Sequence, residues 1–242
     1  MITPGSLDTI VVIPTYAEAA TIGGLIREIL ALNNAVGCVV VDDNSPDDTS
    51  RIVATLSDQF PGRISLVLRE TERGRATAGI RGHREAIKLK PKYIVEMDAD
   101  FSHEPRYIPV FLREIQNCDV IVGSRFVSGG TDSARGLFRQ VVSTLSGRVY
   151  QLILGLDIKD VGSGFKLYRR EVLEAMPWDS FLSKGIAISM EEIFRIAKSG
   201  YRIREVPINF QQRRGGHSKL RFSDFFEPLR VSIRLAATLG RA

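Results

Sequence analysis

Short, uninterrupted apolar runs alternate with longer amphipathic segments through the first half of this 242-residue chain. Runs such as TIVVI and VGCVVV lack the polar alternation of a half-exposed strand, so they indicate strands that are covered on both faces. The predicted strands are Thr9–Ile13, Gly37–Val41, Ile64–Leu68, Tyr93–Met97 and Val120–Gly123. The segments between them have helical spacing and are Thr21–Leu32, Asp48–Phe60, Thr77–Lys90 and Pro105–Gln116. This alternation predicts a doubly wound, mostly parallel α/β sheet with helices on both faces.

The second half of the chain departs from this alternation after about Gly130. Its predicted elements are a long amphipathic helix over Leu137–Leu154, a short strand at the end of DVGSGFKLY, a helix over Ile188–Ser199, a strand over Tyr201–Val206 and an amphipathic helix over Phe222–Leu239. No internal repeat or clean linker separates the halves. We therefore expect one domain over residues 1–242, made of two halves at about 1–130 and 131–242.

Composition sets weak limits on the partners of the chain. Lys and Arg outnumber Asp and Glu by 33 to 28, and this basic excess suits nucleic acid, an anionic membrane or phosphate ligands alike. No run approaches the roughly 20 apolar residues that span a bilayer, and no secretory signal is recognisable at the start. Cys38 and Cys118 lack any ligand-like spacing, so we expect buried bystanders in a reducing cytoplasm.

Polar signatures follow four of the five predicted strands at the point where each strand ends. They are PTYAE after the first strand, DDNSPDDT after the second, DADFSH after the fourth and GSR after the fifth. The carboxyl ends of parallel strands meet at one edge of a sheet, which is where such folds bind ligands. The sequence therefore predicts one site that all four signatures share.

The sharpest of these signatures is the DAD motif at Asp98, Ala99 and Asp100. Residues i and i+2 at a strand end project the same way, so the two carboxylates face one point. Two close like charges need a cation or a shared proton, and Mg²⁺ or Mn²⁺ accepts a few carboxylates together with diphosphate oxygens and water. A solvated acidic turn is the alternative, but the apolar run YIVEM leads directly into the motif and favours a metal site.

The second signature contains two adjacent aspartates, Asp42 and Asp43, which must point to opposite sides. We select Asp43 as the one that faces a ligand, where it would accept a hydrogen bond from a nucleotide base. The alternative is a simple turn with a helix cap at Asp47 or Asp48.

The sequence motifs of other enzyme and nucleotide-binding classes, such as GxGxxG, GxxxxGK, HExxH and GxSxG, are absent. We expect His103, beside the DAD motif, at the protein surface, and contact with a metal or a phosphate is the alternative.

Basic residues supply the cationic part of a phosphate site. Arg125 lies in GSR, just past the fifth strand, and Arg139 and Ser143 are four residues apart, so they share a helix face and can hold one phosphate. Arg213 and Lys219 lie in a loop whose two glycines permit close approach of the backbone to a ligand. A solvated cationic loop is the alternative interpretation.

Two amphipathic segments, Leu137–Leu154 and Phe222–Leu239, combine apolar stripes with arginines. Helices of this type can lie in the headgroup zone of a membrane. Stripes of the same kind also form protein cores and subunit contacts, so both interpretations stay open.

Taken in order, seven motifs resemble the dolichol-phosphate mannose synthase group of the inverting family 2 glycosyltransferases, in its compact type without a transmembrane domain. These motifs are IPTYAE, VVDDNSPDDT, EMDADFSHEP, VGSRF, DVGSGFKLYRREVL, SMEEIFRIAKSGYRIREVPINF and RRGGHSK. The resemblance runs from about Thr9 to Lys219 and implies a GT-A fold. It also implies that residues 1–130 bind a nucleotide sugar and residues 131–242 bind the acceptor.

The resemblance also implies roles for individual residues. The donor nucleoside would be framed by Pro14, Tyr16, Glu18, Val41 and Asp43. The divalent cation, Mg²⁺ or Mn²⁺, would be held by Asp98, Asp100 and Ser102, with Ala99 on the nucleotide through its backbone. Donor or acceptor phosphates would be bound by Arg125, Arg213 and Lys219, and the acceptor phosphate by Arg139 and Ser143. The catalytic residues would be Asp100, Arg125, Arg139 and Ser143.

The activity implied by the resemblance is inverting transfer of mannose from GDP-mannose to a polyprenyl or dolichyl phosphate. It would take place on the cytoplasmic face of a membrane, where a membrane-anchored partner protein is a further expectation. The alternatives are a different donor such as UDP-glucose and a non-catalytic subunit of a membrane glycosylation complex. No DNA- or RNA-binding module is recognisable, so no nucleic-acid partner is expected.

The sequence also departs from the family pattern. The glycine-rich GLGTA segment of the family reads GRATA here, with Arg75 and Ala76 in place of leucine and glycine. Ala17 and Asp48 replace a usual asparagine and glycine. These changes leave the DAD motif intact, but they leave the donor base and the sugar open.

Overall fold

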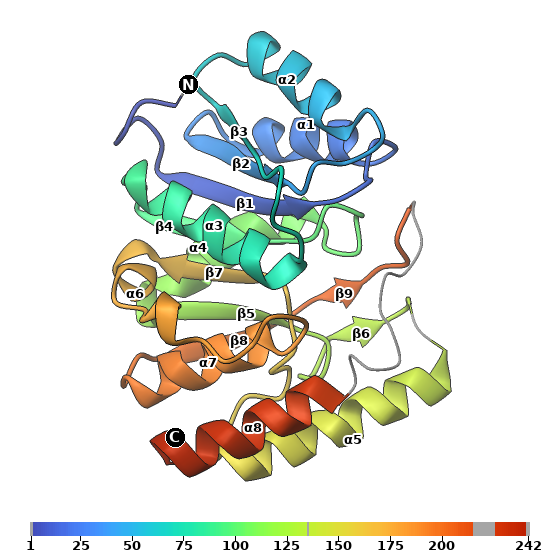
Figure 1. The fold of residues 1–242 in the computed structure, drawn as a ribbon, viewed down its shortest axis with the longest axis vertical. Coiled ribbons are helices and arrows are strands. Elements are labelled where there is room, and N and C mark those ends of the chain that lie inside the picture. Colours follow the sequence, from blue (N-terminus) through green and yellow to red (C-terminus); the bar gives the residue numbers. More distant parts are fainter. Residues whose placement is uncertain (1, 135, 215–225, 241–242) are drawn as a thin grey trace.

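A seven-stranded sheet forms the centre of the protein (Figure 1). The structure is a computed structural model that describes residues 2–134, 136–214 and 226–240. In spatial order the strands are β3 (Ile64–Leu68), β2 (Val36–Asp42), β1 (Thr9–Thr15), β4 (Tyr93–Glu96), β7 (Lys166–Arg169), β5 (Val120–Ser124) and β8 (Ile203–Pro207). All neighbours pair in parallel except β7, which is antiparallel to both β4 and β5. The predicted mostly parallel α/β sheet is confirmed.

The continuous apolar runs form strands because both faces of the sheet are covered. Along β1, Val11 and Ile13 face one apolar cluster, whereas Ile10 and Val12 face the other. All seven residues of β2 are buried. A strand that is buried on both faces has no need of polar alternation, which explains the pattern of the sequence.

Helices cover the two faces of the sheet in two layers (Figure 1). One layer contains α1 (Ile22–Leu32), α2 (Thr49–Gln59) and α4 (Ile108–Glu114). The other layer contains α3 (Arg75–Lys88), α6 (Arg170–Glu174) and α7 (Ile188–Lys198). Three short 3-10 helices are Pro105–Tyr107, Ile115–Asn117 and Trp178–Ser180. The first two flank α4, so the helix expected over Pro105–Gln116 is divided into three pieces.

Two helices, α5 (Leu137–Leu154) and α8 (Phe226–Leu239), lie side by side at the end of the molecule next to α7 (Figure 1). Helix α5 has the predicted bounds and ends at Gly155, whose φ of 72° is left-handed. The predicted start of the last helix, residues 222–225, lies outside the described residues. No helix of the described residues is both long and apolar enough to cross a bilayer.

Two features of the fold were not part of the prediction. Strand β7 comes back antiparallel between β4 and β5, so the chain does not wind in one direction throughout. A small parallel ribbon of β6 (Thr131–Asp132) and β9 (Asn209–Phe210) was not predicted. Strands of two residues carry too few side chains to show a period. This ribbon brings the 209–214 segment toward the carboxyl ends of the central strands.

Candidate active site

The carboxyl ends of β1, β2 and β4 are followed by backbone turns that ordinary residues rarely adopt. Ala17, Asn44 and Phe101 have positive φ values of 55°, 52° and 63°. This left-handed region crowds the β-carbon against the backbone. Such strain persists only where the surrounding structure enforces it, and it gathers at ligand sites. These strained turns therefore lie at the edge of the sheet where we expected the polar signatures to meet.

The first aspartate of the DAD motif is held by an arginine. Both Nε and Nη2 of Arg75 donate to Oδ1 of Asp98, at 3.0 and 2.8 Å. A β-carbon on Gly164 would lie 2.5 Å from Nη2, so glycine at this position leaves room for the guanidinium as it is placed. Burial would raise the pKa of Asp98, but the charge and hydrogen bonds of Arg75, together with the charge of Arg213, outweigh it and hold that pKa well below its usual range. Asp98 is therefore an ionised carboxylate at any pH near neutral.

The second aspartate is held by the segment that follows β9. Nη2 of Arg213 lies 2.7 Å from Oδ2 of Asp100. The backbone N–H of Arg214 donates to the carbonyl of Asp100 at 3.0 Å, and the Arg214 guanidinium stacks on the Phe101 ring. These contacts bring Asp100 and Arg213 together, as the sequence predicted for two members of one phosphate site.

His103 supports the DAD turn from inside the protein, so the expectation that it lies at the surface was wrong. Its ring stacks on Phe165 and meets the edge of Phe210, with ring centroids 5.0 and 5.4 Å away. Burial lowers the pKa of His103, which favours the neutral ring. Its Nδ1 accepts the backbone N–H of Asp98 at 3.1 Å. The burial of His103 could not be predicted from the sequence, because it depends on Phe165 and Phe210, which are far from His103 along the chain.

The oxygen atoms of the DAD turn suit a hard divalent cation. The Oγ of Ser102 is buried and has no hydrogen-bond partner among the described residues. The Ser102 backbone N–H donates to Oδ1 of Asp100 at 2.9 Å, so serine and carboxylate are neighbours. On Asp98, Oδ2 is 3.7 Å from His103 Nδ1, beyond hydrogen-bond distance. Two carboxylates and an orphaned hydroxyl form an all-oxygen donor set, which Mg²⁺ and Mn²⁺ prefer.

Asp42 and Asp43 serve different partners, as adjacent side chains at a strand end must. Asp42 accepts from the Thr15 hydroxyl, at 3.1 Å, and from the backbone and hydroxyl of Ser45. Asp43 accepts Nε of Arg69 at 2.6 Å and the Gly74 backbone N–H at 2.8 Å. Asp43, which we selected as the ligand-facing residue, is thus buried against an arginine that the sequence analysis did not identify.

The other residues expected around the nucleoside lie at the ends of β1, β2 and β4. Pro14 and Val41 are partners in the β1–β2 register. Glu18 and Ala99 are buried, and the Arg73 guanidinium lies over the Tyr16 ring. The structure therefore gathers this set at one edge of the sheet.

Arg125 is paired with a carboxylate that the sequence analysis did not identify. Nε and Nη2 of Arg125 bind the two oxygens of buried Asp160, at 2.7 and 2.6 Å. The guanidinium also stacks on Phe210, the ring that contacts His103. Through Phe210, Arg125 belongs to the same cluster as the DAD turn. Burial would lower the pKa of Arg125, but Asp160 raises it, so the charge is permanent.

Three predicted residues are placed less fully. Ser143 is half-buried on α5. The Arg139 side chain and the whole of Lys219 lie outside the described residues. The role of Arg139 and Ser143 on the acceptor phosphate, and that of Lys219 on a donor or acceptor phosphate, stay predictions.

Comparison with protein families agrees with this geometry. The model described as "Glycosyl transferase family 2" matches residues 10–176, which is more than half of the chain and includes the DAD motif. The chain belongs to glycosyl transferase family 2. It is therefore a glycosyltransferase, and the family expected from the ordered motifs is confirmed.

Relatives of this glycosyltransferase carry related names. An undecaprenyl-phosphate mannosyltransferase of Micrococcus luteus is 34% identical over 212 residues, which cover 86% of each chain. A dolichol-phosphate mannosyltransferase of Pyrococcus furiosus is 36% identical over 232 residues, which cover 93% of this chain and 62% of the relative. Among solved structures, glucosyl-3-phosphoglycerate synthase of Mycobacterium tuberculosis, in complex with Mn²⁺, UDP and glucosyl-3-phosphoglycerate, superposes with a TM-score of 0.66. It is 19% identical, and the match covers 98% of this chain and 81% of that one. The expected GT-A fold is confirmed.

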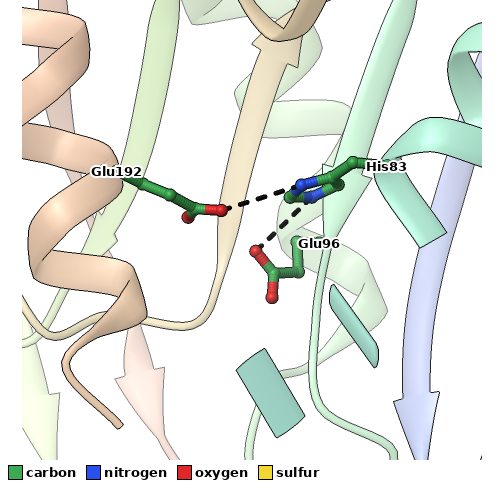
Figure 2. Close-up of side chains that lie close together, drawn as sticks. All are labelled: His83, Glu96 and Glu192. Carbon is green, nitrogen blue, oxygen red and sulfur yellow. Dashed lines mark ion pairs between the residues drawn. The ribbon is translucent and has the colours of Figure 1, made fainter. Parts of the chain in front are cut away.

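Beneath the DAD turn, the glycosyltransferase contains a buried charged network of His83, Glu96, Lys166 and Glu192. Figure 2 shows the His83 ring facing both glutamates, and its nitrogens lie 3.6 Å from Glu96 and 3.7 Å from Glu192. Lys166 Nζ lies 2.6 Å from Glu192 and 3.6 Å from Glu96. All four side chains are buried. The sequence analysis did not find this network, because each of its members lies on a different element.

We interpret this network as structural and not as a metal site. Among the described residues, His83, Glu96 and Glu192 are the one group of three metal-binding side chain types close enough to share an ion. However, the Lys166 ammonium already lies against both carboxylates. A divalent cation would have to displace a buried, paired charge, so we interpret the group as a structural ion network.

Proposed function

We propose that this glycosyltransferase transfers mannose from GDP-mannose to a polyprenyl or dolichyl phosphate and inverts the configuration at the sugar. The observation that carries the proposal is the DAD turn, where Asp98 pairs with Arg75 and Asp100 pairs with Arg213 at the carboxyl edge of the sheet. The names of the relatives support mannose as the sugar and a lipid phosphate as the acceptor. UDP-glucose as the donor is the alternative.

In the proposed reaction, an oxygen of the lipid phosphate attacks the anomeric carbon of the sugar. The bond to the diphosphate breaks, and the nucleoside diphosphate leaves with the electron pair. A phosphate monoester is anionic near neutral pH, so no strong general base is needed. Catalysis then depends on placement and on neutralising the charge of the leaving group.

Asp98, Asp100 and Ser102 would hold Mg²⁺ or Mn²⁺. When bound, the cation neutralises negative charge that develops on the diphosphate. Arg125 and Arg213 would supply positive charge for the diphosphate, and we assign Lys219 to this role as well. Asp100 orients Arg213 through its 2.7 Å ion pair. Around the donor nucleoside we place Pro14, Tyr16, Glu18, Val41, Asp43 and Ala99.

The acceptor phosphate would be bound by Arg139 and Ser143 on α5. We infer that residues 1–130 mainly bind the donor and residues 131–242 mainly bind the acceptor. This division follows the fold, because the DAD turn belongs to the first half and α5 to the second. A membrane-anchored partner protein is a further part of the proposal.

We also infer that α5 and α8 lie on the cytoplasmic face of a membrane. Exposed apolar residues on α5 recur at helical spacing and are Val141, Leu145, Val149 and Leu152. Those on α8 are Phe226, Leu229, Ile233 and Leu239. Arg148 and Arg234 lie on the same helices and suit anionic headgroups. A lipid acceptor would be met at such a surface.

The experiment that tests the proposed function offers GDP-mannose and UDP-glucose together, with polyprenyl phosphate and Mn²⁺, and identifies the lipid product by mass spectrometry. We expect the mass of polyprenyl phosphate plus one hexose, with the hexose traced to an isotope-labelled mannose donor. A product whose hexose carries no label must have drawn it from UDP-glucose and would support the alternative donor. An unmodified lipid in the presence of both donors would contradict the proposed transfer.

A further inference from the structure

We propose that Arg75 is a built-in counter-cation of the DAD motif, which holds Asp98 in the absence of a divalent cation and competes with that cation for the carboxylate. The cation would then bind tightly only together with the diphosphate of the donor. The proposal rests on the metal role that we propose for Asp98 and Asp100.

The first observation is how Arg75 holds Asp98. Two guanidinium N–H groups converge on a single oxygen, Oδ1, while the third nitrogen, Nη1, lies 3.3 Å from Glu96 Oε1. The guanidinium thus lies between two carboxylates. The side chains of Arg75 and Asp98 are 33% and 31% exposed, so an ion can reach this pair from solvent.

The second observation is that the fold leaves space for the Arg75 side chain and supplies Glu96 as its second carboxylate partner. Arg75 is the first residue of α3 and follows Gly74, whose φ of 126° few other residues adopt. Gly164 leaves the space that the guanidinium fills. Glu96, its lower partner, is itself fixed by Lys166 of the buried network. The fold therefore positions the arginine beside the motif.

The third observation concerns charge. Asp98 and Asp100 carry two negative charges, and Arg75 and Arg213 place two positive charges on them. A divalent cation gains little attraction from carboxylates that are already neutralised, and a guanidinium a few ångströms away repels it. A bound diphosphate would restore the negative charge, and it would also offer the displaced guanidinium a new partner. Binding of the cation and of the diphosphate would thereby favour each other.

The test measures Mn²⁺ affinity of the full chain without nucleotide, by electron paramagnetic resonance of free Mn²⁺. We expect Arg75→Met to bind Mn²⁺ about tenfold more tightly than the wild type, because the competing charge is gone. If Arg75→Met does not fold, Arg75→Gln keeps a polar group for Glu96 without the charge and should also bind more tightly. A purely structural Arg75 would give the opposite sign, since its loss would release Asp98 and weaken the site.

The matched control is Arg81→Met, which removes an exposed arginine of the same helix that pairs with Glu85. Its Mn²⁺ affinity should equal that of the wild type. Unchanged or weaker Mn²⁺ binding by a folded Arg75 variant would overturn the proposal. Asp98→Asn distinguishes a failure of the metal role of the DAD motif from a failure of the Arg75 proposal alone. If it binds Mn²⁺ as the wild type does, the metal role of the DAD motif fails and the Arg75 proposal fails with it. If it loses Mn²⁺ while Arg75→Met gains nothing, only the Arg75 proposal is wrong.

Discussion

At the scale of single residues, the charged groups of the candidate site already have partners within the protein. Asp98 pairs with Arg75, Asp100 with Arg213, and Arg125 with Asp160. Asp100 and Asp160 are buried, and an unpaired buried charge costs several kcal/mol, so these two carboxylates need their arginine partners. A phosphate ligand would therefore bind by exchanging partners with these residues.

The contribution of such a pair to stability can be tested with Arg125 and Asp160. Replacing Asp160 with Asn leaves a guanidinium that is only 11% exposed without its carboxylate, and we expect the free energy of unfolding to fall by about 3 kcal/mol. Chemical denaturation measures the change. Asp179→Asn, which removes the exposed partner of Arg84, is the control and should have little effect. Equal, small effects of the two substitutions would show that the buried pair is not needed for stability.

The chemical state of Cys38 is a second property at this scale. Burial raises the pKa of its thiol to about 12, far above the usual value for cysteine. Only the thiolate reacts with disulfide reagents, so at pH 8 about one Cys38 in ten thousand is reactive. We expect no modification of Cys38 in the native protein and full modification in guanidinium chloride, as read by mass spectrometry. Rapid labelling of native Cys38 at pH 8 would contradict the burial seen here.

At the scale of elements, the sequence predicted most of the strands and helices but not how β7 enters the sheet. A buried strand usually shows a continuous apolar run, and β7 contains Lys166 instead. A buried lysine is stable only with carboxylate partners, here Glu96 and Glu192 from β4 and α7. No local pattern can show that three distant elements will supply these charges to one place. The antiparallel insertion of β7 was therefore not predictable from the sequence.

Helices α5 and α8 carry the membrane proposal and its test. Leu145 and Ile233 are 55% and 54% exposed, and Leu145→Glu or Ile233→Glu should weaken binding to anionic vesicles about tenfold. Vesicle sedimentation measures binding, and thermal melting should show an intact fold. Leu68→Glu is the matched control, because Leu68 is also exposed but lies on β3 at the opposite edge of the sheet. If all three variants bind vesicles equally, the face of α5 and α8 does not contact lipid.

At the scale of the whole molecule, the buried network joins the sequence before about residue 130 to the sequence after it, here called the two halves of the chain. Glu96 and His83 belong to the first half, and Lys166 and Glu192 to the second. Lys166→Met would leave two buried glutamates short of positive charge, and we expect the free energy of unfolding to fall by about 3 kcal/mol or more. Lys88→Met, which breaks an exposed pair with Glu85, is the control for denaturation experiments. Comparable stability of the two variants would mean that the network does not hold the halves together.

The sequence predicted the fold class and the edge of the sheet where the polar signatures meet, because strand ends in a parallel sheet have a fixed place. The shared metal role of Asp98 and Asp100, inferred from their spacing, stays a prediction. The internal partners Arg69, Arg75 and Asp160 could not be predicted in this way. Each depends on a contact between segments far apart in the chain, and those contacts appear only when the fold is complete.

The central claim is that Asp98 and Asp100 hold a divalent cation against the diphosphate of a nucleotide. An anomalous difference map from crystals grown with Mn²⁺ and GDP tests it most directly. We predict one strong peak at about 2.2 Å from oxygens of both aspartates, in contact with the diphosphate. A peak between His83, Glu96 and Glu192, or bound GDP with no ion at the DAD turn, would contradict the claim.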